Sequence, residues 1–118
     1  MTGTQRDVPV PASHLDLVAA PAVGVLSTLL PGGAPHSCLV RVGYDGRCTR
    51  LSTTLDSRSG RNLRANPAAS LLIVDPGDTG RFLQLRGRAE LLPAGRRGDR
   101  AVVVRLHATR ITADAIHH

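Results

Sequence analysis

The stretch LSTTLDSRSGRNL (residues 51–63) predicts a strand that turns directly into a short helix, with Ser57 as the N-cap. A helix start leaves backbone N–H groups unpaired and carries the positive end of the helix dipole. The hydroxyl groups before it, together with Arg58 and Arg61 in its first turn, would complete a cradle for a phosphate group. The same residues are also typical of a plain N-cap followed by a solvated basic face.

The rest of the chain has the composition of one ordinary globular domain. Its 118 residues suit a single core, with 42% hydrophobic and 20% charged residues. No apolar run approaches the roughly 20 residues of a membrane-spanning helix, and the first ten residues contain no apolar block of the signal-peptide kind. We therefore expect a cytoplasmic protein without membrane segments, in which residues 1–12 form a flexible arm and residues 13–118 form one domain.

The charge of the chain favours an anionic ligand. All fifteen basic residues are arginine, and the formal net charge is +6. The guanidinium group binds phosphate and carboxylate through a rigid fork. Nucleic acid is the disfavoured anion, because the chain has one Phe, one Tyr and no Trp with which to stack bases. Its arginines are also spread along the chain rather than gathered in one basic run.

The cysteines and histidines predict neither a disulfide framework nor a metal site. Cys38 and Cys48 lack the spacing of either, and they fit a reducing compartment. No two histidines stand at metal-ligand spacing, and His107 is expected to be an exposed cross-strand partner in the last strand. We set aside His117 and His118, because a terminal histidine pair is typical of an expression tag.

Hydrophobic patterns and turn signals predict a mainly β protein with two short helices. The first helix would begin at Ser13 as its N-cap and stop before Pro21, and the second would span residues 57–65. A strong hairpin signal, Asp45-Gly46, joins the second and third strands. Short connections favour a small antiparallel barrel with a core of Leu, Val, Ile and Ala. The predicted strands are residues 22–29, 34–44, 47–54, 69–74, 81–92 and 101–111.

The fifth predicted strand alternates between an apolar face and a polar one. The apolar side is expected to face the core, and it consists of Leu83, Leu85, Ala89 and Leu91. On the other side, Arg86 and Arg88 form either a solvated strand face or part of a binding surface. The turn that follows carries further arginines, which either solvate it or meet the acidic tail of a ligand: Arg96, Arg97 and Arg100.

The order of the motifs resembles one family. A strand ending in Ser-Thr-Thr is followed by Ser-Arg-x-x-Arg-Asn-Leu, then Asn-Pro and an apolar strand, then Arg-Phe-Leu-Gln-Leu-Arg-Gly-Arg-Ala-Glu. This order resembles the pyridoxamine 5′-phosphate oxidase-like split β-barrel flavoproteins, and within them the deazaflavin (coenzyme F420)-dependent reductases. The resemblance runs from about residue 14 to 111. It implies a six-stranded antiparallel split barrel that forms a homodimer with cofactor sites between the subunits.

The resemblance also implies a set of cofactor-binding residues. Contacts to the cofactor phosphate would come from Ser52, Thr53, Ser57, Arg58 and Arg61. The second strand would line the flavin ring with His36, Ser37, Cys38, Leu39, Val40 and Arg41. Ser59 belongs to the same site but stands where many relatives have lysine. His36 is equally typical of a surface strand histidine, and Cys38 of a small buried filler.

The implied chemistry needs no protein nucleophile. Hydride transfer belongs to the ring of FMN or F420, and the protein supplies placement and electrostatics. A chain with one glutamate and no catalytic triad is consistent with a reaction whose chemistry belongs to the cofactor. We expect an oxidoreductase that binds FMN or F420 at a dimer interface and exchanges hydride with a small molecule. The alternative is a non-catalytic protein that binds or carries a flavin or another small anion. The resemblance also implies a helical segment between the last two strands, but here only residues 92–100 are available, so the wall that this segment would add to the substrate pocket is either absent or supplied by another part of the protein.

Overall fold

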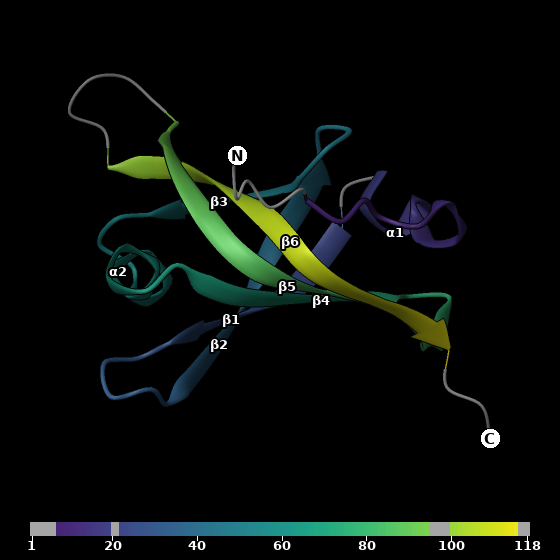
Figure 1. Ribbon diagram of the computed structural model, residues 1–118, viewed down its shortest axis with the longest axis horizontal. Coiled ribbons are helices and arrows are strands. Elements are labelled where there is room, and N and C mark those ends of the chain that lie inside the picture. Colours follow the sequence, from purple (N-terminus) through teal and green to yellow (C-terminus); the bar gives the residue numbers. More distant parts are fainter. Residues whose placement is uncertain (1–6, 20–21, 95–99, 116–118) are drawn as a thin grey trace, which may run out of the picture.

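The computed structural model describes residues 7–19, 22–94 and 100–115. Its strands close into one antiparallel barrel in the order β1-β2-β3-β6-β5-β4 (Figure 1). The predicted mainly β class and six-stranded antiparallel barrel are therefore confirmed for the described residues. The strands are β1 (Ala22–Leu29), β2 (Pro35–Tyr44), β3 (Thr49–Thr54), β4 (Ala68–Asp75), β5 (Asp78–Pro93) and β6 (Ala101–Ala115).

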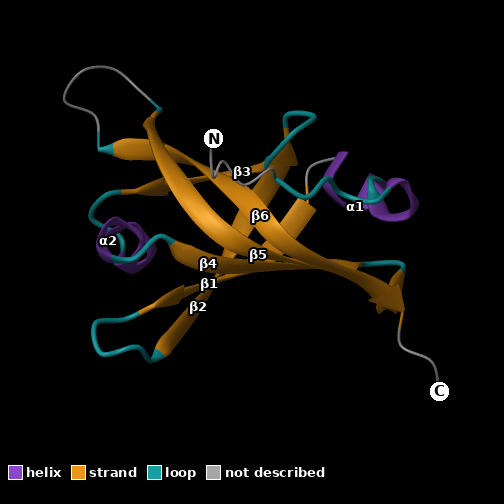
Figure 2. Ribbon diagram, viewed as in Figure 1, coloured by secondary structure: helices purple, strands orange, loops and turns teal. Residues whose placement is uncertain are grey.

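The described chain contains two short α-helices, coloured purple in Figure 2, and neither could span a membrane. Helix α2 (Arg58–Ala65) begins after the N-cap Ser57, as predicted. The first predicted helix is wrong at its start. A 3₁₀ turn (Ala12–His14) comes first, and α1 (Asp16–Ala19) follows it, so Ser13 lies inside the turn. Proline at position 11 explains this, because its ring fixes φ at −60° immediately before the 3₁₀ turn.

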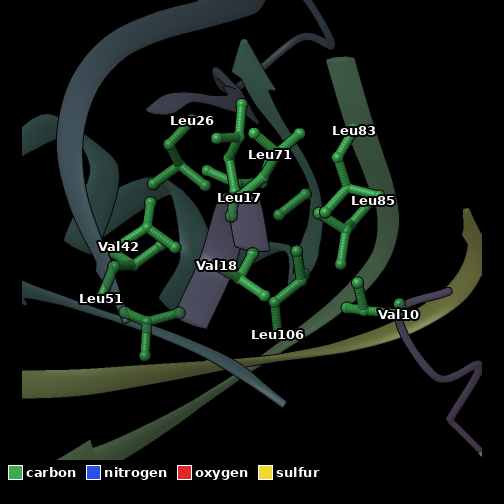
Figure 3. Close-up of a cluster of buried hydrophobic side chains, with 14 of the residues drawn as sticks. Val10, Leu17, Val18, Leu26, Val42, Leu51, Leu71, Leu83, Leu85 and Leu106 are labelled. Atoms are coloured by element: carbon green, nitrogen blue, oxygen red, sulfur yellow. The ribbon is translucent and has the colours of Figure 1, made fainter. Parts of the chain in front are cut away.

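Alternation along the strands fills the barrel with aliphatic side chains. Leu83 and Leu85 of β5 are 0% and 1% exposed, and Ala89 and Leu91 pack against the core from farther along the strand. The predicted apolar face of this strand is therefore confirmed. Figure 3 shows that α1 contributes to the same cluster. Among the labelled residues of that cluster are Leu17, Val18, Leu26, Val42, Leu51, Leu71 and Leu106.

The hairpin between β2 and β3 explains why β3 begins later than predicted. The Asp45 carboxylate Oδ1 accepts hydrogen bonds from the backbone N–H groups of Arg47 and Cys48, at 2.9 and 2.8 Å. These two residues are thereby held in the turn, and the strand starts at Thr49. The Asp-Gly turn itself is as predicted, with Gly46 at φ +93°.

The last two strands run longer than predicted and are interrupted by a bulge. The register of β5 against β6 shifts between Arg86 and Gly87. A Cβ atom at Gly87 would lie 2.0 Å from the carbonyl oxygen of His107, so only glycine allows this close approach. Two arginines of the connecting turn, Arg96 and Arg97, lie outside the described residues.

Part of the predicted N-terminal arm lies against the barrel. The Val8 N–H donates a hydrogen bond to the carbonyl oxygen of Ala108 on β6, at 2.8 Å. Val10 is only 9% exposed and belongs to the core cluster. Residues 1–6 lie outside the described part of the chain. The segment from Asp7 onward therefore contributes both a hydrogen bond and apolar surface to the domain.

Candidate functional site

Ser57 holds the start of α2 against the end of β3. Its hydroxyl donates to the carbonyl oxygen of Thr54 at 2.8 Å and accepts from the Gly60 N–H at 2.9 Å. The Thr53 hydroxyl lies 2.8 Å away and supplies the remaining hydrogen bond. A hydroxyl has one donor and two acceptor positions, so that of Ser57 is fully used by the protein. Its contribution to a ligand is therefore to orient the helix start.

Two residues that sequence reasoning missed fix where α2 sits. A Cβ atom at Gly60 would lie 2.0 Å from the carbonyl oxygen of Thr54, so this position requires glycine. The buried side-chain amide of Asn62 donates a hydrogen bond to Thr28 of β1 at 3.0 Å. Glycine inside a helix costs about 1 kcal/mol relative to alanine, which is the signal that could have revealed the first of them.

A groove of about 740 Å³ lies along β2, β3 and the start of α2, and we call it the β2–β3–α2 groove. It brings together most of the predicted cofactor-binding residues. Two of them do not line it. Ser37 forms a hydrogen bond with Ser27 of β1, at 2.9 Å between the hydroxyl oxygens, and Arg61 is exposed on α2. The predicted residues that line the groove are His36, Cys38, Leu39, Val40, Arg41, Ser52, Thr53, Ser57, Arg58 and Ser59.

Other lining residues were not predicted. Arg50 stands two residues before Ser52 on β3, so strand alternation could have placed both on one face. Gly43 of β2 is the cross-strand partner of Arg50 and also lines the groove, and the position of its missing Cβ atom is open space. The remaining residues that line the groove without having been predicted are Val42, Leu51 and Val103.

The β2–β3–α2 groove is electropositive. Arg41, Arg50 and Arg58 line it, whereas none of the described Asp or Glu residues does. None of these three arginines forms a salt bridge within the described part of the chain. The backbone N–H groups of Arg58 and Ser59 also have no acceptor among the described residues. Fixed positive charges and helix-start N–H groups without anionic partners favour binding of an anion here.

Ser59 and Cys38 form a polar contact in the wall of the groove. The Cys38 Sγ and Ser59 Oγ atoms are 3.1 Å apart, and Ser59 is only 4% exposed. At position 59 the chain therefore offers a buried hydroxyl and no charge. His36 lines the groove nearby, and its Nδ1 is enclosed without a hydrogen-bond partner in the described protein.

A second cavity, of about 620 Å³, lies over β1, β4, β5 and β6. Arg86 and Arg88 line it, so the face that we described as solvated or binding does border a cavity. Arg110 lines it too and is the direct cross-strand partner of Arg86. Neither of the two described α-helices begins at this cavity, and its described walls contain none of the predicted cofactor-binding residues. The β2–β3–α2 groove is therefore the stronger candidate.

Cys48 belongs to a polar cluster away from the groove. Burial and the nearby Asp7 carboxylate raise the pKa of its thiol to about 11, which makes it a poor nucleophile. His107 contacts Glu90 of the neighbouring strand, as expected of a cross-strand partner, but its side chain is only 33% exposed. Hydrogen bonds to Asp7 and Glu90 raise the pKa of the imidazole.

Comparison with known proteins assigns the family. The family model described as pyridoxamine 5′-phosphate oxidase matches residues 10–116, which is nearly the whole chain. The chain belongs to the pyridoxamine 5′-phosphate oxidase family. No curated protein matches it in sequence. The residues that match this family include β2, β3 and α2, the elements that form the groove.

Solved structures resemble the chain over most of its length. An F420 reductase is 25% identical, covering 87% of this chain and 98% of its own, with a TM-score of 0.77. The hypothetical protein Rv2991 of Mycobacterium tuberculosis is 20% identical, with coverages of 99% and 95% and a TM-score of 0.76. General stress protein 26 of Bacillus anthracis is 17% identical, with coverages of 86% and 94% and a TM-score of 0.71. The last two share the pyridoxamine 5′-phosphate oxidase fold with this chain.

Proposed function

We propose that the chain is an oxidoreductase that binds FMN or F420 in the β2–β3–α2 groove and exchanges hydride with a small molecule. The observation that carries the proposal is the charge of the groove. Among the described residues, Arg41, Arg50 and Arg58 line it without a carboxylate, beside two helix-start N–H groups that have no acceptor in that part of the chain. Family membership and the F420 reductase among its structural relatives support a cofactor of this class.

The residues fit the phosphate end of such a cofactor. Arg58 and the N–H groups of Arg58 and Ser59 would hold the phosphate from the helix side, and the hydroxyl of Ser52 would hold it from β3. The Thr53 hydroxyl also lines the groove, but its proton is used in the hydrogen bond to Ser57. Ser57 keeps these donors in position through its three hydrogen bonds. Along β2, the exposed side chain of Leu39 offers apolar surface for a ring system. Cys38 and Val40 line the groove beside it while packing against the core, and His36 adds one polar edge.

A bound flavin or deazaflavin would supply the hydride chemistry itself. The chain's own residues would bind the phosphate, orient the ring along β2 and restrict water on that side. No nucleophile or acid–base pair of the protein is needed for this. The same groove also suits the alternative, a protein that binds or carries a flavin without turnover. The alternative is favoured by the short connection after β5, which leaves little chain to wall a substrate pocket.

We also propose that two copies pair through an outer apolar face. Val23, Leu39 and Val74 lie on the outer sides of β1, β2 and β4, and they are 56%, 74% and 37% exposed. The register of the strands brings this face together, because Val25 of β1 is the partner of both Leu39 and Leu72. Leu39 also lines the groove. Pairing through this face would therefore put each cofactor site at the subunit boundary.

Titration with FMN and with F420, followed by fluorescence, tests the function. We expect saturable binding of one of them in the micromolar range, and oxidation of the reduced cofactor by an acceptor would separate an enzyme from a carrier. Arg64→Ala is the matched control, because Arg64 is an exposed arginine of the same helix that does not line the groove. If neither cofactor saturates the protein, the proposal fails.

Light scattering tests the pairing. We expect the wild-type chain to be a dimer at micromolar concentration and Val23→Asp to be a folded monomer, because the charge would be buried without a partner at the interface. A wild-type monomer under these conditions would rule out the dimer. Cofactor affinity of the Val23→Asp variant then reports whether the second subunit completes the site.

A further inference from the structure

Three side chains of types that can bind metal ions lie close together at the N-terminal end of β3, the end opposite to α2. Cys48 immediately precedes β3, His107 lies on the neighbouring strand β6, and Asp7 comes from the N-terminal segment. The Asp7 Oδ2 atom is 2.8 Å from His107 Nδ1 and 3.2 Å from Cys48 Sγ. The sulfur and the same ring nitrogen are 3.6 Å apart. One carboxylate oxygen, one imidazole nitrogen and one sulfur thus form a small triangle.

The triangle has nearly the size that a tetrahedral metal ion requires. Zinc binds sulfur at about 2.3 Å and nitrogen or oxygen at about 2.0–2.2 Å, which separates neighbouring ligand atoms by about 3.3–3.6 Å. The side between the sulfur and the imidazole nitrogen already has this length. The side between the sulfur and the Asp7 oxygen must lengthen by about 0.4 Å, and the side between Asp7 and His107 by about 0.6 Å. Sulfur, imidazole and carboxylate together favour a borderline transition metal over calcium or magnesium.

The surroundings of the cluster also suit a metal ion. The other ring nitrogen of His107 is 2.7 Å from Glu90 Oε1, the arrangement that orients a metal-bound histidine. A Cys48 thiolate and an Asp7 carboxylate would balance a divalent charge. Arg105 lies on the sulfur side, with its Nη2 3.6 Å from Cys48 Sγ, and could donate to the thiolate. Its own charge is met by Asp45, at 3.4 Å, and by Glu90, at 3.6 Å.

We propose that Asp7, Cys48 and His107 bind a divalent transition-metal ion, with Zn²⁺ as the representative, and that this ion fastens the N-terminal segment to the barrel. The three ligands come from segments 41, 59 and 100 residues apart, so the ion would tie together parts of the chain that only folding brings close. A fourth ligand would be solvent, which reaches the partly exposed Asp7 and His107.

Titration of the chelator-treated full chain with Co²⁺ tests the proposal. We expect binding of one ion per chain and a thiolate-to-cobalt charge-transfer band in the near ultraviolet. Zn²⁺ should abolish that band by competition and should raise the midpoint of thermal unfolding. The titration is made in a His117→Ala/His118→Ala background, so that the terminal histidine pair cannot bind the probe.

Matched variants locate the ion. Cys48→Ser should lose the band and the thermal shift, whereas Cys38→Ser, which changes the chain's other cysteine, should keep both. Asp7 lies on the N-terminal segment and is partly exposed, so the Asp7→Asn variant should fold. The affinity of this variant for Co²⁺ should fall at least about tenfold. Absence of the band in the wild-type background, its persistence in Cys48→Ser or an unchanged affinity of Asp7→Asn would each overturn the proposal.

Discussion

Arg81 and Arg58 are the same residue type in two different electrostatic environments. Arg81 on β5 is 2.6 Å from the carboxylate of Asp16 and 2.9 Å from that of Asp75, and it joins α1, β4 and β5. Arg58 at the start of α2 forms no salt bridge in the described part of the chain and lines a groove without acids. The guanidinium group of Arg81 stabilises the fold, whereas that of Arg58 is available to bind a ligand. The positions of the described acidic residues therefore distinguish these two arginines.

The largest effect is expected where the groove's frame itself is altered. In Gly60→Ala, the new methyl group would lie 2.0 Å from the Thr54 carbonyl oxygen, which is backbone and cannot rotate away. The start of α2 must shift, and overpacking of this kind costs about 1–3 kcal/mol. We expect both the free energy of unfolding, measured with urea, and cofactor affinity to fall. Unchanged stability would mean that α2 does not pack on β3 as described.

Arg58→Ala is expected to separate binding from stability. A charge-assisted contact is worth about 1.5–3 kcal/mol, which corresponds to roughly ten- to more than a hundredfold in affinity. We expect at least about tenfold weaker binding of FMN or F420 in fluorescence titrations, with an unchanged unfolding midpoint, because an exposed arginine contributes little to stability. The loss should shrink at high salt, where the wild-type contact is screened. Wild-type affinity in a folded variant would contradict the phosphate cradle.

Arg81→Ala should do the reverse. It removes a guanidinium group that holds two carboxylates and also bonds to the carbonyl oxygen of Ser13, so the unfolding midpoint should fall. Cofactor affinity should stay within about twofold of wild type, because Arg81 does not line the groove. Thermal unfolding and the same fluorescence titration measure the two quantities. If Arg81→Ala lost cofactor affinity while its stability stayed unchanged, Arg81 and Arg58 would not differ in the way described.

The Arg81 region also predicts how stability depends on pH. Hydrogen bonds from Arg81 lower the pKa of Asp16, and hydrogen bonds from the Gly77 N–H and then Arg81 lower that of Asp75, both from about 3.8. A carboxylate whose pKa is lower in the folded state than in the unfolded state stabilises the fold at pH values above its unfolded-state pKa. That stabilisation is lost as the pH falls through its folded-state pKa. Urea midpoints should therefore fall below about pH 4, and less steeply in Arg81→Ala. Equal slopes in both proteins would contradict this assignment.

Much of the fold follows from local signals in the sequence. The Asp45-Gly46 turn, the alternation of Leu83 and Leu85, and the N-cap Ser57 each describe a few neighbouring residues, and the structure has all three. Ser52, Thr53 and Arg58 of the groove could likewise be predicted, because β3 and α2 follow one another directly, whereas Arg50 was missed. The predicted contact between Ser57 and the cofactor phosphate is the exception, because the Ser57 hydroxyl already forms its hydrogen bonds within the helix start.

Contacts across the barrel could not be predicted in the same way. The approach of Asp7, Cys48 and His107 depends on the register between β3 and β6 and on the docking of the N-terminal segment. The spacing of these residues along the chain indicates neither the strand register nor the docking of the N-terminal segment. The pairing of Gly43 with Arg50 is of the same kind, since it depends on the register that the hairpin turn imposes.

Arg61→Ala gives the smallest expected effect and the finest test of the comparison. Arg61 follows Arg58 by three residues on α2, is exposed and does not line the groove. Its charge therefore reaches a ligand only through solvent, where salt screens it within about 10 Å at 0.1 M. We expect affinity to fall by less than about threefold at low salt, and to match wild type at high salt. A loss as large as that in Arg58→Ala would mean that the anion lies over the outer face of α2, and the groove would no longer be the site that its unpaired arginines indicate.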